Sequence, residues 1–426
     1  MNQPYNNTAL LKQDDFEGIR FHFKKRNTER YDKQKYLIQE LVRPRLKITI
    51  VTETWSPEIN GVAHSLLQLT QGLQKLGHKI LLIRPEQKHR CNEFQPYKEC
   101  LVKAQKIPKY SGLQFGWPQY LKVRQALESF APDVVHIVTE GPLGLTVQQA
   151  ANLLNVPISS GFHSPFQDFS RFFDLAFLMK PVQHYLRWFH NNTQLTCVPN
   201  LETAHSLRRL GFRCPLAVVG RGVDCTRFSP TYFSSALRRQ WGVCENTRVM
   251  LYVGRLSPEK EIDVLISAYR SMPMENRVPT KLVIVGDGPD RARLERFAIG
   301  LDVIFMGSLS GQALSQAYAS ADVFVFASQV ETFGNVVLEA MASGSPVIAY
   351  DAACAGQHVR DGYTGWLSPI GRTDLLIRHM QQLPPRVRLR EMGCEAALDA
   401  AKIGWQHPVQ QFEQALYSVV DQAVLA

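Results

Sequence analysis

The sequence of 426 residues has no long apolar run, no secretory leader pattern and no paired-cysteine motif. None of its apolar stretches approaches the roughly 18 uncharged residues that a membrane-spanning helix needs. The first residues, MNQPYNNTALLKQDDFEGIR, do not place a basic segment before an apolar one, which argues against a secretory signal. The eight cysteines show neither C-x-x-C nor cysteine–histidine metal spacing. These absences predict a cytoplasmic protein with reduced thiols.

The composition is otherwise ordinary, with 45% hydrophobic and 20% charged residues, and the length suggests two or three domains. The net charge of +10 has two concentrations: residues 1–45 hold ten basic against six acidic side chains, and residues 84–109 hold seven against three. No nucleic-acid-binding motif accompanies this charge, so we expect no nucleic-acid partner. The basic surface is consistent with contact to an anionic membrane surface, which would place the protein peripherally on the inner membrane face, or with a solvated face.

Apolar strand patterns alternate with helix patterns along most of the chain, as in the strand from Leu46, the helix to Leu76 and the strand from Lys79. This order is typical of parallel α/β sheets. The pattern starts again at the apolar run Val249–Gly254, after a turn-rich segment near residues 215–235. The sequence therefore predicts an α/β fold in two domains, with the boundary in that segment.

The stretch Ala327–Pro346 is expected to carry the chemistry. It has the pattern of a buried parallel strand, a polar loop and a helix that begins near Val336. In open parallel sheets, ligands bind beyond the carboxyl ends of the strands, and a helix N-terminus there suits a phosphate. Glu331 precedes that N-terminus and Glu339 follows it. Phe333 in the loop would be exposed unless a partner covered it.

Two motifs in this sequence resemble a known family. ETFGNVVLE at 331–339 resembles the E-x7-E signature of the retaining nucleotide-sugar glycosyltransferases with the GT-B fold, which is α/β with two Rossmann-like domains facing a central cleft. TETWSPEINGVAHSL at 52–66 is similar to the opening of bacterial GDP-mannose-dependent α-mannosyltransferases. The resemblance extends from about Arg45 to the C-terminus. It implies a basic extension at 1–45, an acceptor domain at 46–220, a nucleotide-sugar domain at 221–400 and a C-terminal helix at 401–426 that packs back on the first domain.

The resemblance also implies three groups of site residues, and the residue types suit the chemistry. Two fixed cations and a helix N-terminus can neutralise a diphosphate leaving group. The expected diphosphate-binding residues are Gly61, Arg255, Lys260, Gly334 and Asn335. The expected nucleotide-binding residues are Glu339, Gly286 and Asp287. The expected catalytic residues are His163 and Glu331, which would contact the transferred sugar.

The expected reaction moves a sugar, mannose from GDP-mannose, to a hydroxyl of a lipid or lipid-linked acceptor. No D-x-D motif stands at a strand end, so we expect no obligatory metal and no cofactor beyond the donor. A UDP-sugar-dependent glucosyl-type transferase is the alternative donor hypothesis, and a nucleotide-sugar epimerase is an alternative reaction. A phosphorylase is disfavoured, because the sequence shows no motif for a cofactor-binding lysine. A two-lobed binding protein would not need Arg255, Lys260, Glu331 and Glu339 together.

Two positions depart from the family pattern. Ser164-Pro165-Phe166 stands where Thr-Asn-Phe is usual, and Pro165 removes a backbone donor. Glu261 stands where the family often has asparagine after the lysine. The segment Phe166–Phe189 is unusually aromatic and interleaved with basic residues, which indicates either core packing or a platform for the acceptor.

Overall fold

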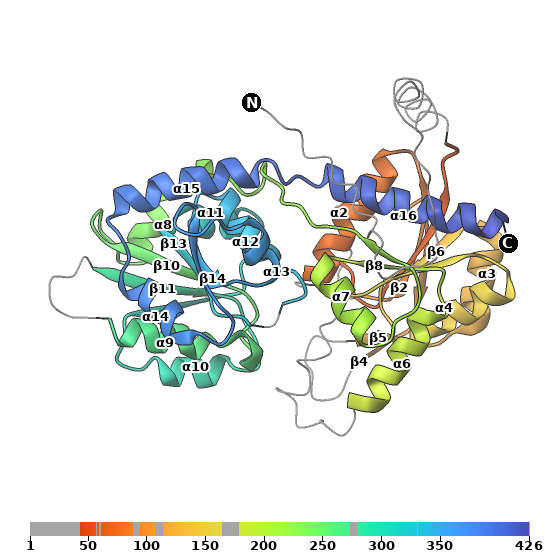
Figure 1. The fold of residues 1–426 in the computed structure, drawn as a ribbon, viewed down its shortest axis with the longest axis horizontal. Helices are drawn as coiled ribbons and strands as arrows, with labels where there is room; N and C mark the ends of the chain where they lie inside the picture. The colour runs from red at the N-terminus through yellow and green to blue at the C-terminus, as the bar shows by residue number, and fades with distance from the viewer. Residues whose placement is uncertain are drawn as a thin grey trace.

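The computed structural model describes residues 43–425 apart from 57, 59–60, 88–93, 107–113, 164–178, 273–278 and 330. In Figure 1 these residues form two α/β units side by side, each built on a central parallel sheet flanked by helices. The expectation of an α/β fold with two Rossmann-like domains is thereby confirmed. The serine–proline–phenylalanine departure at 164–166 and the aromatic residues up to 177 lie outside the described residues.

The first unit contains a seven-stranded parallel sheet in the order β3-β2-β1-β6-β7-β8-β9. Its strands are β1 (Lys47–Val51), β2 (Lys79–Pro85), β3 (Lys98–Val102), β6 (Val134–Ile137), β7 (Ile158–Gly161), β8 (Leu195–Val198) and β9 (Leu216–Val218). A small antiparallel hairpin of β4 (Ala104–Lys106) and β5 (Gln114–Gly116) lies outside it. The five central strands, β2, β1, β6, β7 and β8, are buried along almost their whole length because helices cover both faces of a parallel sheet. The strand order reverses at β1 and β6, so a crevice for a ligand is expected beyond their carboxyl ends.

The two faces of this sheet bury separate cores. Ile48 and Ile50 of β1 pack with Leu66 of α2 (Gly61–Lys75), and with α16 (Gln406–Leu425), on one face. Val51 packs with α3 and α4 on the other face, around Val147. The helices that follow these strands are α2 (Gly61–Lys75), α3 (Tyr120–Phe130), α4 (Pro142–Leu153), α6 (Met179–Asn191) and α7 (Leu201–Arg209).

The second unit contains a six-stranded parallel sheet in the order β12-β11-β10-β13-β14-β15. Its strands are β10 (Arg248–Val253), β11 (Thr280–Val285), β12 (Val303–Gly307), β13 (Val323–Phe326), β14 (Val347–Tyr350) and β15 (Gly365–Ser368). Its helical elements are η2 (Pro230–Tyr232), α8 (Ser235–Gln240), η3 (Pro258–Lys260), α9 (Ile262–Arg270), α10 (Arg291–Phe297), α11 (Gly311–Ala319), α12 (Asn335–Ala342), α13 (Ala353–His358), α14 (Thr373–Gln381) and α15 (Arg386–Ala400). The order reverses at β10 and β13, so the loops after these two strands meet.

The chain passes between the two units twice. The first passage follows β9 and the second follows α15, and they are joined where Val223 N donates to the Ile403 carbonyl at 2.9 Å. Gly222 permits this contact, since a Cβ there would lie 2.7 Å from the backbone carbon of Gly404. The last helix, α16 (Gln406–Leu425), then lies over the first unit (Figure 1). Among the helices described, none is long and apolar enough to cross a membrane.

Candidate active site

The loops after β10 and β13 bring a lysine and a glutamate together. Lys260 ends η3 and Glu331 lies in the loop before α12. The Nζ of Lys260 forms an ion pair with Oε1 of Glu331, and each side chain is 18% exposed. A cation and an anion therefore stand side by side at the switch point of the second sheet, where both remain accessible to a ligand.

Glu339 lies on α12 (Asn335–Ala342), about one turn beyond its first residue, and is held by a tyrosine. The hydroxyl of Tyr318, on α11, donates to Oε2 of Glu339 at 2.9 Å. Burial raises the pKa of Glu339, while this hydrogen bond and the positive charge of Arg227 act in the opposite direction. The second carboxylate oxygen has no side-chain donor among the described residues, so it is free to accept from a ligand hydroxyl.

The start of α12 faces the start of α2 across the domain boundary. Gly334 has a φ of 88°, a left-handed conformation that glycine adopts without strain, and the helix begins at Asn335, one residue before the expected start. The Nδ2 of Asn335 donates to Oγ of Ser65 at 3.0 Å, whereas its Oδ1 is buried and has no partner among the described residues. A Cβ at Gly61 would lie 3.9 Å from Nδ2 of Asn335. Three of the predicted diphosphate-binding residues are therefore adjacent.

The other predicted donor-binding residues lie in the loops after β10 and β11. Arg255 is exposed, and its carbonyl accepts from the hydroxyl of Tyr252 at 3.1 Å. Gly286 has a φ of 139°, and a Cβ there would lie 1.8 Å from the Gly254 carbonyl oxygen, so close packing by itself requires a glycine. Asp287 is exposed and pairs with Arg291 at 3.4 Å. The binding roles of these residues remain predictions.

His163 follows β7 and contacts both the domain-linking segment and the second domain. Its carbonyl oxygen accepts from Oγ1 of Thr332 at 2.9 Å, and the Thr332 carbonyl accepts from Nδ2 of Asn200 at 3.1 Å. Nδ1 of the His163 ring is 3.1 Å from Nη2 of Arg221. The structure thus brings the His163 backbone next to Thr332, the residue that follows Glu331, so the two predicted catalytic residues come from opposite domains and are linked through Thr332.

One expectation about the loop is wrong. Phe333 was expected to be exposed without a partner, but it is only 6% exposed and packs in the core of the second domain. Its ring centroid lies 6.2 Å from that of His358. The Phe333 side chain therefore anchors the loop to the core of its own domain. The residues that bury it are distant in the sequence, so the local sequence does not reveal them.

The backbone conformation at Glu261 suits the asparagine that the family often has at this position. It has a φ of 49°, in the left-handed region, at the junction of η3 and α9. Asparagine tolerates this conformation better than glutamate does. The carboxylate of Glu261 accepts from Nε2 of Gln329 at 2.8 Å, which ties the lysine-bearing loop to the loop of Glu331.

Several residues at the site were missed by sequence reasoning. Arg221 and Thr332 contact His163, and Arg227 acts electrostatically on Glu339. Glu53 follows β1 and accepts at Oε1 from Leu143 N at 2.9 Å. Burial is the main cause that raises the pKa of Glu53 to about 7. The one local sequence signal for Arg221 is its position in a turn between Gly220 and Gly222.

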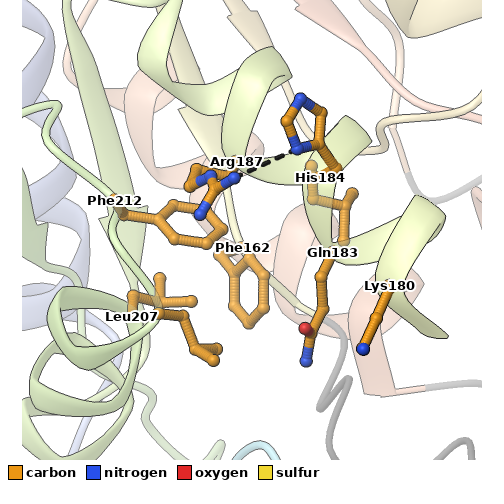
Figure 2. A pocket seen from close by; sticks show the side chains of 9 residues that line it. Phe162, Lys180, Gln183, His184, Arg187, Leu207 and Phe212 are labelled. Atoms are coloured by element: carbon orange, nitrogen blue, oxygen red, sulfur yellow. Dashed lines mark hydrogen bonds between the residues drawn. The ribbon is translucent and has the colours of Figure 1, made fainter.

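A pocket lies between α6 and α7, beside the residue that precedes His163. Figure 2 shows Phe162, Leu207 and Phe212 on its apolar floor, with Lys180 and Arg187 of α6 near it. No acidic residue is among the described residues that line it. The pocket combines an apolar floor with a cationic rim.

Elsewhere, no group of three or more metal-ligating side chains occurs in the described residues, and the expectation that no metal is needed remains a prediction.

Comparison with known proteins places this chain in a family. The chain matches the family described as glycosyl transferases group 1 over residues 234–389 and that described as glycosyltransferase family 4 over residues 59–227. It is 34% identical over 330 residues to the GDP-mannose-dependent alpha-mannosyltransferase of Mycobacterium tuberculosis, across 76% of this chain and 84% of the relative. It is 26% identical over 315 residues to the alpha-monoglucosyldiacylglycerol synthase of Streptococcus pneumoniae, across 72% of this chain and 71% of that protein.

The solved structures agree on the fold. Sucrose-phosphate synthase from Thermosynechococcus elongatus superposes with a TM-score of 0.72 at 20% sequence identity, over 89% of this chain and 100% of that chain. The family matches cover both domains, and the E-x7-E loop lies within the group 1 match. The protein is therefore an enzyme that belongs to the GT-B glycosyltransferases with a group 1 domain.

Proposed function

We propose that this protein is a retaining α-mannosyltransferase that transfers mannose from GDP-mannose to a hydroxyl of a lipid or lipid-linked acceptor. The observation that carries the proposal is the ion pair of Lys260 with Glu331, next to the start of α12 and opposite His163. The similarity to GDP-mannose-dependent α-mannosyltransferases supports the choice of donor.

In this proposal the second domain binds the donor. Lys260 and Arg255, with the N–H groups at the start of α12, neutralise the diphosphate as it leaves. Glu339 uses its free carboxylate oxygen to accept from ribose hydroxyls, and Tyr318 holds the other oxygen. Glu331 accepts from hydroxyls of the sugar, and its pairing with Lys260 keeps it oriented between substrate and diphosphate.

The transfer step keeps the configuration of the sugar carbon. The bond from that carbon to the phosphate oxygen breaks, and the acceptor oxygen bonds to the carbon on the same face. The proton of the acceptor hydroxyl goes to the leaving phosphate. The protein contributes position and electrostatic stabilisation, and the two domains exclude water from the reacting atoms.

A donor screen by thermal shift tests the nucleotide. GDP, UDP, ADP and their sugars are added to the wild type, to Glu339→Ala and to the exposed control Glu391→Ala. A ligand that binds the folded state raises its melting temperature. We expect GDP and GDP-mannose to stabilise the wild type and the control, but not Glu339→Ala. Stabilisation by UDP alone would favour the glucosyl-type alternative, and no shift with any nucleotide would contradict the donor site.

The acceptor is proposed to be a lipid because of the pocket between α6 and α7. An apolar floor suits acyl chains, and Lys180 and Arg187 at the rim suit an anionic headgroup or surface (Figure 2). The similarity to a diacylglycerol-modifying synthase supports a lipid acceptor. We also propose that the protein acts at the inner membrane face, through this rim and the basic residues of its N-terminal sequence.

Transfer of radiolabelled mannose to diacylglycerol, glycosylated diacylglycerol and water-soluble sugars tests the acceptor. Label in the organic phase that depends on the lipid supports the proposal, and label only in water-soluble products contradicts it. Turnover without any acceptor would instead favour hydrolysis or epimerisation. Flotation with anionic and neutral liposomes tests the membrane contact, and equal, negligible binding to both would exclude it.

A further inference from the structure

Arg227 lies on the first of the two segments that link the domains, and its guanidinium is unpaired. Its backbone N donates to the Asp224 carbonyl at 3.1 Å and to Oδ1 of Asp224 at 3.3 Å. Among the described residues, Nε is buried without a partner, and the two Nη groups, which are not buried, also meet no acceptor. This is unusual for a half-buried arginine, because buried polar groups are normally hydrogen-bonded.

The nearest acid in the sequence does not neutralise this cation. Oδ1 of Asp224 accepts from N of Thr226 at 2.9 Å and from Oγ1 of Thr226 at 2.6 Å, which closes the turn. No ion pair of Arg227 occurs in the described part of the chain. Its Cζ lies 5.5 Å from the centroid of the Phe228 ring, a contact that leaves the N–H groups unused. The charge of Arg227 is therefore available to a ligand.

Aromatic contacts connect this arginine to Glu339, the predicted nucleotide-binding carboxylate. The Phe228 ring packs edge-on against that of Tyr318, with the ring centroids 5.6 Å apart. The hydroxyl of Tyr318 in turn donates to Oε2 of Glu339 at 2.9 Å. Burial raises the pKa of Glu339, and the charge of Arg227 is one of the two effects that lower it. The cation is thus near the proposed ribose position.

Arg227 is also near the helix with which the first domain borders the site. His64 lies on α2 next to Ser65, and Oγ of Ser65 accepts from Nδ2 of Asn335 at 3.0 Å. Burial is the main cause that lowers the pKa of His64 to about 4, and the charge of Arg227 is the next largest cause. The cation therefore lies where α2, α12 and the linking segment converge.

The order of groups in a nucleoside diphosphate sugar indicates which of them Arg227 reaches. In the proposed function, the ribose is at Glu339, and the outer phosphate is at Lys260 and the start of α12. The inner phosphate, which is bonded to the ribose, lies between these two positions.

We propose that Arg227 is a third donor-binding cation, whose Nη groups bind the inner phosphate of the nucleotide from the segment that links the domains. A guanidinium suits this task, because two of its N–H groups can pair with two phosphate oxygens. The inference rests on the proposed function for the position of the donor.

Displacement of a fluorescent GDP analogue from the full-length protein measures the affinity for guanosine, GMP and GDP. Arg227→Met should weaken GMP and GDP binding by about tenfold or more, because a charge-assisted contact is lost. Guanosine binding should change by less than about twofold, because guanosine carries no phosphate. Arg227→Lys should recover part of the loss, since lysine keeps the charge but not the paired N–H geometry.

Arg208→Met is the matched control. Arg208 of α7 is also half-buried, but its Nη1 donates to the Phe212 carbonyl at 2.7 Å, and it belongs to none of the predicted donor-binding loops. Its affinities for all three compounds should equal those of the wild type. If the donor screen selects UDP, the same series is measured with uridine, UMP and UDP.

Three results would overturn the inference and leave the donor site intact. Unchanged affinities in Arg227→Met would show that no contact exists. A loss for GDP but not for GMP would place the cation at the outer phosphate. An equal loss for guanosine and GMP would show that Arg227 acts on the ribose position or on the fold. Failure of the wild type to bind any nucleotide would contradict the proposed function, and this inference with it.

Discussion

Lys260 and Glu331 form an ion pair between loops 71 residues apart in the sequence. The pair exists because β10 and β13 are neighbours in the sheet and both loops leave its carboxyl edge. Each partner has a proposed role of its own, with the lysine toward the diphosphate and the glutamate toward the sugar. The pair therefore orients both groups before the donor arrives, which lowers the cost of organising the site.

Replacing Lys260 by methionine should reduce kcat/KM for the donor by about 10²-fold or more, because a fixed cation near the leaving group is lost. Lys402→Met is a suitable control, since Lys402 also pairs with an acid, Asp399, but is 74% exposed. Initial rates of GDP release at varied GDP-mannose concentration measure the effect. Equal rates in both variants would show that Lys260 does not act on the diphosphate.

Glu53 should make stability depend on pH. Its pKa is raised in the folded protein from 4.5 to about 7, so the native state binds more protons than the unfolded chain between these values. Stability is then lost as the pH rises through this range, by at most about 3 kcal/mol. Urea unfolding at pH 5 and pH 8 should show a smaller decrease for Glu53→Gln than for the wild type. An unchanged decrease would mean that Glu53 titrates normally.

Substitutions at Glu261 should separate backbone strain from side-chain contact. Because its φ is 49°, Glu261→Gly should stabilise the fold by roughly 0.5–1 kcal/mol, whereas the β-branched Glu261→Val should destabilise it. Loss of the bond from Gln329 is common to both variants and serves as the internal control. Urea unfolding midpoints provide the measurement, and the same change in both variants would contradict the strain.

Gly286 should tolerate no side chain. A Cβ there would meet the Gly254 carbonyl oxygen at 1.8 Å, in addition to the cost of a positive φ. Gly300→Ala is the matched control, because Gly300 also has a positive φ, of 81°, but has open space around it. We expect the control to lose about 1 kcal/mol of stability and Gly286→Ala to lose clearly more. Thermal melts of both variants measure this difference. Gly300→Ala adds only backbone strain, whereas Gly286→Ala adds backbone strain and a steric clash.

Local patterns predicted most of the strands and helices. Many buried strands, such as β13, are continuous apolar runs, so the run before Glu331 and the helix that carries Glu339 were found to within a residue or two. The hairpin of β4 and β5 was not expected, because strands of three residues leave no periodic pattern. Phe333 was misjudged, because its cover comes from residues distant in the sequence.

The sequence by itself determined the α/β class, the motif E-x7-E and the residue types that a diphosphate and a sugar require. These follow from side-chain periodicity and from short spacings, which are local properties of the chain. Only the tertiary structure decided that Lys260 pairs with Glu331, that Asn335 contacts Ser65 and that Arg221 fixes the ring of His163. These contacts join separate strands or the two domains. They depend on strand order and on domain packing, and neither can be inferred from a local sequence pattern.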